Sequence, residues 1–177
     1  MRVAQAYVRF VNRLNERVGF GVSWLTTLLV LVVCYDVFTR YLLKSSLVAV
    51  QELEWHLFAL VFLIGAAYSL KHNRHVRVDV FYTRFSPRTR AWVDFAGSVL
   101  FLIPFCLIVV WSSKNFVYNS FVIGEISPDP GGLPARFVLK AAIPVGFVLL
   151  FLQGIALALQ SLFRLLGVEG EQEEVGV

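Results

Sequence analysis

Long apolar blocks separated by short polar segments run through the chain, and this pattern predicts helices that cross a membrane. The blocks cover residues 19–38, 53–70, 92–111 and 137–163. An α-helix rises about 1.5 Å per residue, so about 20 apolar residues cross the roughly 30 Å hydrocarbon core of a bilayer. We therefore expect an all-α membrane protein whose four transmembrane helices form one domain over residues 19–165. The fourth block is longer than this thickness requires, so its helix should tilt or project.

The two ends of the chain differ from these blocks. Residues 1–18 combine apolar residues at helical spacing with four arginines, Arg2, Arg9, Arg13 and Arg17. This pattern is typical of a basic amphipathic interfacial helix on an anionic membrane surface, and a plain helical extension of the first span fits it equally well. Residues 166–177 are acidic, and we expect a disordered tail there. The expected apolar face of the N-terminal segment consists of Val3, Ala6, Tyr7, Phe10, Val11 and Leu14.

Proline and glycine interrupt the apolar pattern at two places. Pro104 lies inside the third block and predicts a kink, because proline lacks the amide donor and its ring disturbs the preceding turn. After this block, residues 112–125 keep a helical apolar pattern, which predicts either a continuation of the helix or an interfacial helix. Residues 127–134 contain three prolines and two glycines, so this segment should be a fixed turn or loop.

The distribution of basic residues predicts which side of the membrane each loop faces. The side that holds the N-terminus and the 71–90 segment carries eleven lysines and arginines, and the opposite side carries five. Because basic loops stay in the cytoplasm, we expect an N-in/C-in topology. The tryptophans agree, since two lie toward inner ends of spans and two at outer ends, as in an aromatic belt.

Composition supports the membrane interpretation and argues against two others. Of the 177 residues, 58% are hydrophobic, against about 45–50% in soluble domains. The formal net charge is +4, but the basic residues flank the spans without the basic and aromatic mixture of a nucleic-acid surface, so we expect no nucleic-acid partner. Cys34 and Cys106 lie inside apolar blocks, which predicts packing residues rather than a disulfide or a metal site.

The residues that usually carry catalysis or transport are poorly placed for either. An enzyme needs a nucleophile, a base or metal ligands at a shared depth, whereas His56 lies at the outer end of the second span and His72 and His75 at its inner end. We therefore expect no enzyme activity and no metal or haem cofactor. A self-sufficient transporter should place an ionisable or broken-helix site near mid-membrane, but the charged residues of the spans lie near span ends. This favours an accessory membrane subunit.

Polar residues gather at the outer ends of the spans and form the candidate partner interface. Asp36 and Arg40 are four residues apart, so they share one helix face and can pair. Two interpretations stay open: the charges only cap the spans and meet water, or they form a docking surface for a periplasmic partner or a flanking membrane subunit. The candidate interface residues are Asp36, Arg40, Glu52, Glu54, Trp55, His56, Asp129 and Arg136, with Lys114, Glu125 and Lys140 on the same side.

Several motifs, taken in order, resemble the small membrane subunit of tripartite ATP-independent periplasmic (TRAP) transporters. They are YDVFTRY at residues 35–41, ELEW at 52–55, GAAY at 65–68, HNRHVRVD at 72–79 and SPDPGGLPAR at 127–136. Together, their order and spacing extend the resemblance over roughly residues 20–165.

The resemblance implies a division of labour between three proteins. In such systems a soluble periplasmic binding protein captures an organic acid, and a large membrane subunit carries the substrate and sodium sites and moves as an elevator. The small subunit would be a non-catalytic scaffold in the inner membrane of a bacterium or archaeon, in contact with both partners and the lipid bilayer. The substrate stays open, because specificity lies in the partners.

Two other functions remain compatible with the residues. The chain would be a membrane anchor of a respiratory or quinone-linked complex if it bound haem, which an absorption spectrum would reveal. It would be a small multidrug-type exporter if Asp36 and Glu52 coupled proton movement. The inert apolar centres of the spans favour the scaffold.

Overall fold

Helices form the regular structure of the part of the chain that the computed structural model describes, residues 2–72 and 85–167. Four helical stretches in this part are long and apolar enough to cross a membrane: α1, α2, the run from Pro87 to Val122, and α6. This confirms the all-helical class and the expectation of four helices that could span a membrane. His75 and the predicted tail from residue 168 on lie outside the described residues. The helices are α1 (Arg2–Leu42), α2 (Val48–Lys71), α4 (Pro87–Gly97), the π-helical turn η1 (Ser98–Leu102), α5 (Ile103–Val122) and α6 (Arg136–Leu165).

The basic N-terminal segment belongs to α1, a single helix of 41 residues. Of its two interpretations, the structure shows the helical extension of the first span. Val8 and Val11 are buried and pack with Ala156 of α6. Val3 and Phe10 of the expected apolar face stay exposed, so their contact with a membrane surface stays a prediction.

The π-helical turn η1 joins α4 to α5 immediately before Pro104. The amide of Ile103 donates to the carbonyl of Ser98, five residues back instead of four. Pro104 has no amide hydrogen and its ring crowds the carbonyl four residues before it, and a wider turn relieves this conflict. The predicted disturbance at Pro104 is therefore this irregular turn. Beyond it the helix continues to Val122, which confirms the continuation rather than a separate interfacial helix.

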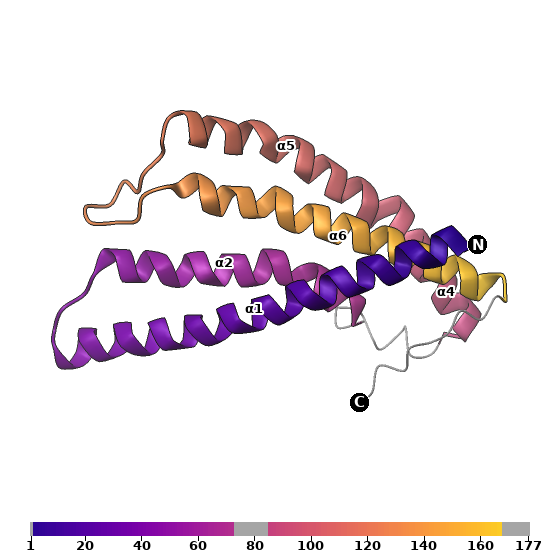
Figure 1. Cartoon of the computed structure of the whole chain (residues 1–177), viewed down its shortest axis with the longest axis horizontal. Coiled ribbons are helices and arrows are strands. Elements are labelled where there is room, and N and C mark those ends of the chain that lie inside the picture. Colours follow the sequence, from indigo (N-terminus) through magenta and orange to yellow (C-terminus); the bar gives the residue numbers. More distant parts are fainter. Residues whose placement is uncertain (1, 73–84, 168–177) are drawn as a thin grey trace.

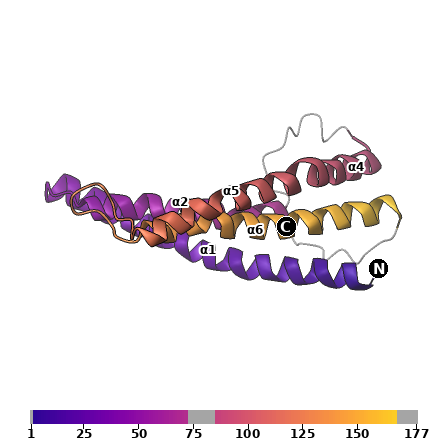
Figure 2. The same cartoon turned by 90° about the horizontal axis from the view of Figure 1, so that it is seen from above.

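The helices form two antiparallel pairs, α1 with α2 and α5 with α6, which meet along α2 and α6. The order across the molecule is therefore α1, α2, α6, α5 (Figure 1). Seen after a turn of 90°, the end that holds the α1–α2 and α5–α6 connections is thin, whereas α4, α6 and the start of α1 spread apart at the other end (Figure 2). Small residues allow the closest approach: a Cβ on Gly146 of α6 would come within 2.5 Å of the Leu63 carbonyl oxygen. α6 is thus the central helix.

Candidate functional site

Glu52, near the start of α2, holds the loop between α5 and α6. Its carboxylate accepts hydrogen bonds from the Ser127 hydroxyl and from the Leu133 amide, the latter at 2.6 Å. The Nη2 atom of Arg136 lies 3.4 Å from the same carboxylate. Glu52 is only 3% exposed, and a carboxylate removed from water requires such donors. Glu52 therefore ties α2 to the loop and to the first residue of α6.

The loop itself is closed by its own backbone. The Arg136 amide donates to the Glu125 carbonyl at 3.1 Å, and the Ser127 amide donates to the Leu133 carbonyl at 3.2 Å. These bonds bring the two ends of residues 125–136 together, as in a compact Ω-loop. The breaker region predicted from its prolines and glycines is thus confirmed as an ordered loop.

Two glycines make this loop geometry possible. Gly131 has a φ of +82°, a conformation that glycine adopts without steric cost. A Cβ on Gly132 would overlap Ser127 and come within 2.8 Å of Glu52 Oε2, so a side chain cannot fit between the loop and the carboxylate. At the tip, Pro128, Asp129 and Pro130 are exposed.

Aromatic side chains complete the surroundings of Glu52. The guanidinium carbon of Arg136 lies 5.6 Å from the centre of the Trp55 ring, within cation–π range. The rings of Trp55 and His56 lie 4.0 Å apart between centroids, and His56 Nδ1 lies 2.6 Å from the Glu52 carbonyl oxygen. We call this group the outer cluster; it consists of Glu52, Trp55, His56, Ser127, Leu133 and Arg136.

A second ion pair supports the same loop. Lys140 of α6 pairs with Glu125, and its ammonium lies 4.1 Å from the centre of the Phe116 ring. The hydrogen bond from Lys140 holds the pKa of the Glu125 carboxyl below its ordinary value. The carboxylate at the start of the loop is therefore stabilised in its charged form.

The remaining predicted interface residues lie apart from the outer cluster or at its edge. Asp36 is 3% exposed and pairs with Arg40, so the two share a helix face on α1 as predicted. Glu54 has a buried carboxylate oxygen without a hydrogen-bond partner among the described residues. The Asp129 amide donates to the Ser127 hydroxyl at 3.2 Å, and its side chain lies at the loop tip. Their role in binding a partner stays a prediction.

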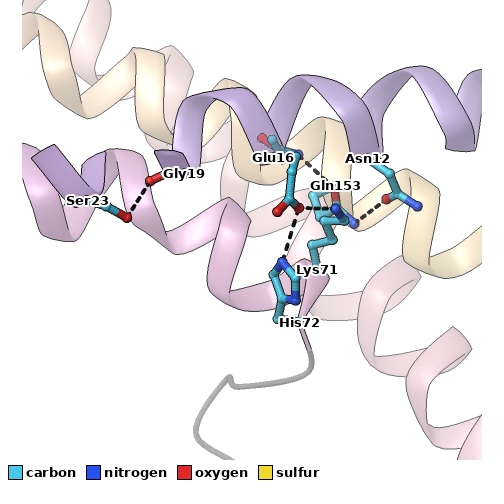
Figure 3. Close-up of polar contacts among 8 residues, drawn as sticks. Asn12, Glu16, Gly19, Ser23, Lys71, His72 and Gln153 are labelled. Carbon is cyan, nitrogen blue, oxygen red and sulfur yellow. Dashed lines mark hydrogen bonds and ion pairs between the residues drawn. The ribbon is translucent and has the colours of Figure 1, made fainter. Parts of the chain in front are cut away.

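Polar contacts toward the other end of the helices tie α1 to α2. Glu16 of α1 pairs with Lys71 at the end of α2, and its carboxylate also lies 3.2 Å from His72 Nε2 (Figure 3). The three residues come from segments more than fifty positions apart in the sequence. This contact fixes the N-terminal half of α1 against the point where α2 ends.

A buried amide network ties the same stretch of α1 to α6. Asn15 Nδ2 donates to Gln153 Oε1 at 2.7 Å. Gln153 Nε2 donates to Asn12 Oδ1 at 3.2 Å (Figure 3). Asn15 is 0% exposed and Gln153 is 2% exposed. Together with Glu16, Lys71 and His72, these three residues form what we call the inner cluster.

The sequence interpretation missed the inner cluster, although two signals point to it. Asn15 follows Val8 and Val11 at intervals of three and four, so it shares their helix face. Gln153 is the one amide side chain between residues 141 and 159, in an otherwise apolar stretch. A polar residue at such a position usually faces a neighbouring helix rather than lipid.

The chain was also compared with known proteins. The family model for tripartite ATP-independent periplasmic transporters, DctQ component, matches residues 29–164, which is more than half of the chain. The matched region contains the whole outer cluster, and within the inner cluster it contains Lys71, His72 and Gln153. No match was found among curated proteins or among solved structures.

Proposed function

Because the chain belongs to the DctQ family, the small membrane component of tripartite ATP-independent periplasmic transporters, we propose that it is the non-catalytic scaffold of a sodium-coupled organic acid importer. The family is a transporter component rather than an enzyme family, and its members work with a large membrane subunit and a substrate-binding protein. In our proposal the large subunit carries solute and sodium, and this chain holds the stationary part of that subunit in the bilayer.

The observation that carries the scaffold proposal is how little of α1 and α2 is buried within the chain. Of the 41 residues of α1, six are buried, and of the 24 residues of α2, four are. Large apolar side chains such as Trp24, Leu31 and Phe38 stay exposed. A thin helical layer with broad apolar faces suits a part that lies between lipid on one side and a larger membrane protein on the other.

Helix contacts support a tilted placement of this layer in the bilayer. Gly146 of α6 lies against Leu63, near the middle of the second apolar block, whereas Gly154 lies against Leu102, near the middle of the third. The centres of the second and third blocks therefore lie opposite points on α6 that are about eight residues, or about 12 Å, apart. From α2 across α6 to α5 there are two helix spacings of about 9 Å each. If both centres lie at the middle of the bilayer, the helices are tilted by roughly 35° from the membrane normal. Tilted helices would brace the large subunit over a wider area than upright ones.

The outer cluster supports a second part of the proposal, a docking contact for the periplasmic binding protein. Glu52 is buried and occupied by the loop, so it serves to fix the loop rather than to meet a partner. The tip of this fixed loop is exposed, and it carries the Asp129 carboxylate. We propose that Asp129 pairs with a basic residue of the binding protein, and that Asp36, Arg40 and Glu54 lie toward the membrane partner.

The proposed topology places the 125–136 loop outside the cell and both chain ends inside the cytoplasm, in the inner membrane of a bacterium or archaeon. Single cysteines at Asp129 and Val177, in a chain whose Cys34 and Cys106 are replaced by alanine, test it. A membrane-impermeant maleimide added to whole cells should label the cysteine at position 129 and not that at position 177. Labelling of position 177 alone would refute the orientation.

The scaffold role is tested by uptake in a strain that lacks the chain. Deletion should abolish uptake while the binding protein still binds its solute, and the full-length chain should restore uptake. Asp129→Lys should lower uptake without reducing co-purification of the large subunit, whereas Lys44→Gln, exposed on the same side, should leave both unchanged. Uptake at the wild-type rate in the deletion strain would disprove the scaffold.

The two alternative functions have separate readouts. A respiratory anchor should show a haem absorption band when purified, and the family match gives that alternative no support. A proton-coupled exporter should lose transport by the isolated chain when Asp36 and Glu52 are both replaced. A scaffold should show no transport alone in liposomes, with or without these replacements.

A further inference from the structure

A groove between α2, α5 and α6 borders the outer cluster, and Trp55 and Arg136 of that cluster line it. Its volume is about 280 Å³, and the aliphatic side chains of Ala59, Leu63, Leu139 and Ile143 form its walls. Arg136 and Lys140 also line it, and Arg136 is the first residue of α6. The groove is thus apolar along α6 and cationic where that helix begins.

Arg136 has hydrogen-bonding capacity that its neighbours leave unused. The two carboxylate oxygens of Glu52 already accept from Ser127 and Leu133, and Arg136 approaches this carboxylate only to 3.4 Å. The Nε atom of Arg136 is buried and has no hydrogen-bond partner among the described residues. A buried donor without an acceptor is costly, and a guanidinium edge matches the oxygens of a phosphate. Arg136 lines the groove and its side chain is 24% exposed, so its guanidinium suits an anionic ligand there.

We propose that this groove binds one glycerophospholipid, with its phosphate against Arg136 and an acyl chain along α6 toward Ile143. Seven residues separate Arg136 from Ile143, which is about 10 Å of helix that leads from the outer end of α6 toward its middle. Trp55 flanks the phosphate position, and tryptophan is enriched at the headgroup level of membranes.

A carboxylate from a protein partner would also satisfy Arg136, but the rest of the groove favours a lipid. Its walls beyond the cations are apolar, with Trp55 and Phe116 beside the aliphatic side chains, and a flexible hydrocarbon chain fills such a space with no polar group to satisfy. The bound lipid would fill the space between α5 and α2 over α6 and stiffen the layer. The site does not depend on the proposed transport function.

Native mass spectrometry of the full-length chain tests the proposal. The chain is released from nanodiscs that contain either phosphatidylglycerol or diacylglycerol. With phosphatidylglycerol present, the wild type should retain one lipid, and with diacylglycerol of the same chains it should retain none. Ala59→Phe, which fills the groove, should abolish retention, whereas Val145→Phe, at an exposed position of α6 that does not line the groove, should not. Arg136→Gln should weaken phosphatidylglycerol binding about tenfold or more, as loss of a charged hydrogen bond does, and Arg40→Gln should leave it unchanged.

Three results would overturn the proposal. The first is equal retention of phosphatidylglycerol by the wild type and Ala59→Phe, with both variants still helical by circular dichroism. The second is equal binding of diacylglycerol and phosphatidylglycerol, which would remove the phosphate contact. The third is a photo-crosslinker at Leu139 that, in the assembled transporter, links to protein and yields no lipid adduct, because a partner side chain would then occupy the groove.

Discussion

The side-chain amide of Asn15 on α1 donates a 2.7 Å hydrogen bond to Oε1 of Gln153 on α6, although 138 residues separate the two. Both side chains are buried. Gln153 also donates a hydrogen bond to Asn12, one turn before Asn15 on α1. In apolar surroundings a helix can slide or rotate against its neighbour with little loss of packing, because lipid and side chains are equally apolar. The amide pair allows only one register, so it positions the N-terminal half of α1.

Removal of either amide should therefore loosen α1 from α6. We expect Asn15→Leu and Gln153→Leu each to lower stability, and the double variant to lower it by less than the sum. Hydrogen bonds between transmembrane helices contribute about 0.6 kcal/mol on average and up to about 1.7 kcal/mol, so the coupling energy should fall in that range. Unfolding in mixed detergent micelles measures it. Gln160→Leu on the same helix is the control. A double variant that loses as much stability as the two single variants together would contradict the prediction.

Gly19 and Gly21 of α1 offer a matched pair of substitutions. A Cβ on Gly19 would overlap the Tyr68 ring of α2, whereas a Cβ on Gly21 would meet nothing within 4 Å. Gly19→Ala should destabilise the α1–α2 pair by about 1–3 kcal/mol. Gly21→Ala should be neutral or stabilise the chain by up to about 1 kcal/mol, because alanine favours the helix. Similar unfolding midpoints for the two variants would show that α1 and α2 are not packed this closely.

The elements of the fold follow from the sequence more readily than their contacts do. A run of about 20 apolar residues has the length of a helix that crosses a bilayer, and a helix satisfies its backbone within the segment, so the blocks at residues 19–38 and 53–70 predict α1 and α2 directly. Proline and glycine in residues 127–134 likewise leave only a loop. Which face of a helix meets protein is harder to predict, since Phe10 and Val11 are equally apolar. In the structure Val11 is buried and Phe10 is exposed.

The candidate site shows the same limit. The sequence places Glu52 at the end of a span, where a carboxylate is expected to meet water. Its burial depends on Ser127 and Leu133, which lie 75 and 81 residues further on and reach it only when α5 and α6 have paired. A contact of this kind has no local pattern in the sequence. The sequence therefore predicted that polar residues gather at the outer ends of the spans, but not which of them form hydrogen bonds with one another.

Glu52 should control the order of the loop that it holds. In Glu52→Ala the Leu133 amide loses its acceptor, which lies 2.6 Å away, and the loop should open more often. Hydrogen exchange at Leu133 should then be faster by about tenfold or more, since a hydrogen bond to a charged group contributes about 1.5–3 kcal/mol. Glu54→Ala is the control on the same helix. Unchanged exchange at Leu133 in Glu52→Ala would mean that the carboxylate does not hold the loop.

The Glu125–Lys140 pair should make stability depend on pH in acid. Lys140 lowers the pKa of Glu125 in the folded chain, so the unfolded chain binds the proton more readily. The stabilisation is therefore complete above the unfolded pKa of about 4.3 and is lost as the pH falls through the lower folded value. Between about pH 5 and about pH 3, the wild type should lose more thermal stability than Lys140→Met does. Lys114→Met should behave as the wild type, and parallel curves for wild type and Lys140→Met would contradict the assignment.

The tilt of the helical layer gives a prediction that can be measured directly in lipid. The fourth apolar block has 27 residues, from 137 to 163, and is therefore about 40 Å long against a hydrocarbon core of about 30 Å. Full burial of this length requires a tilt of roughly 40°, close to the roughly 35° that the offset between Leu63 and Leu102 along α6 indicates. Oriented-sample solid-state NMR of α6 labelled at Gly146 and Gly154 should give a tilt of about 30–45° in bilayers of ordinary thickness, and a smaller tilt in thicker ones. An angle below about 20° in ordinary bilayers would mean that α6 projects from the membrane, and the layer could not then brace its partner obliquely.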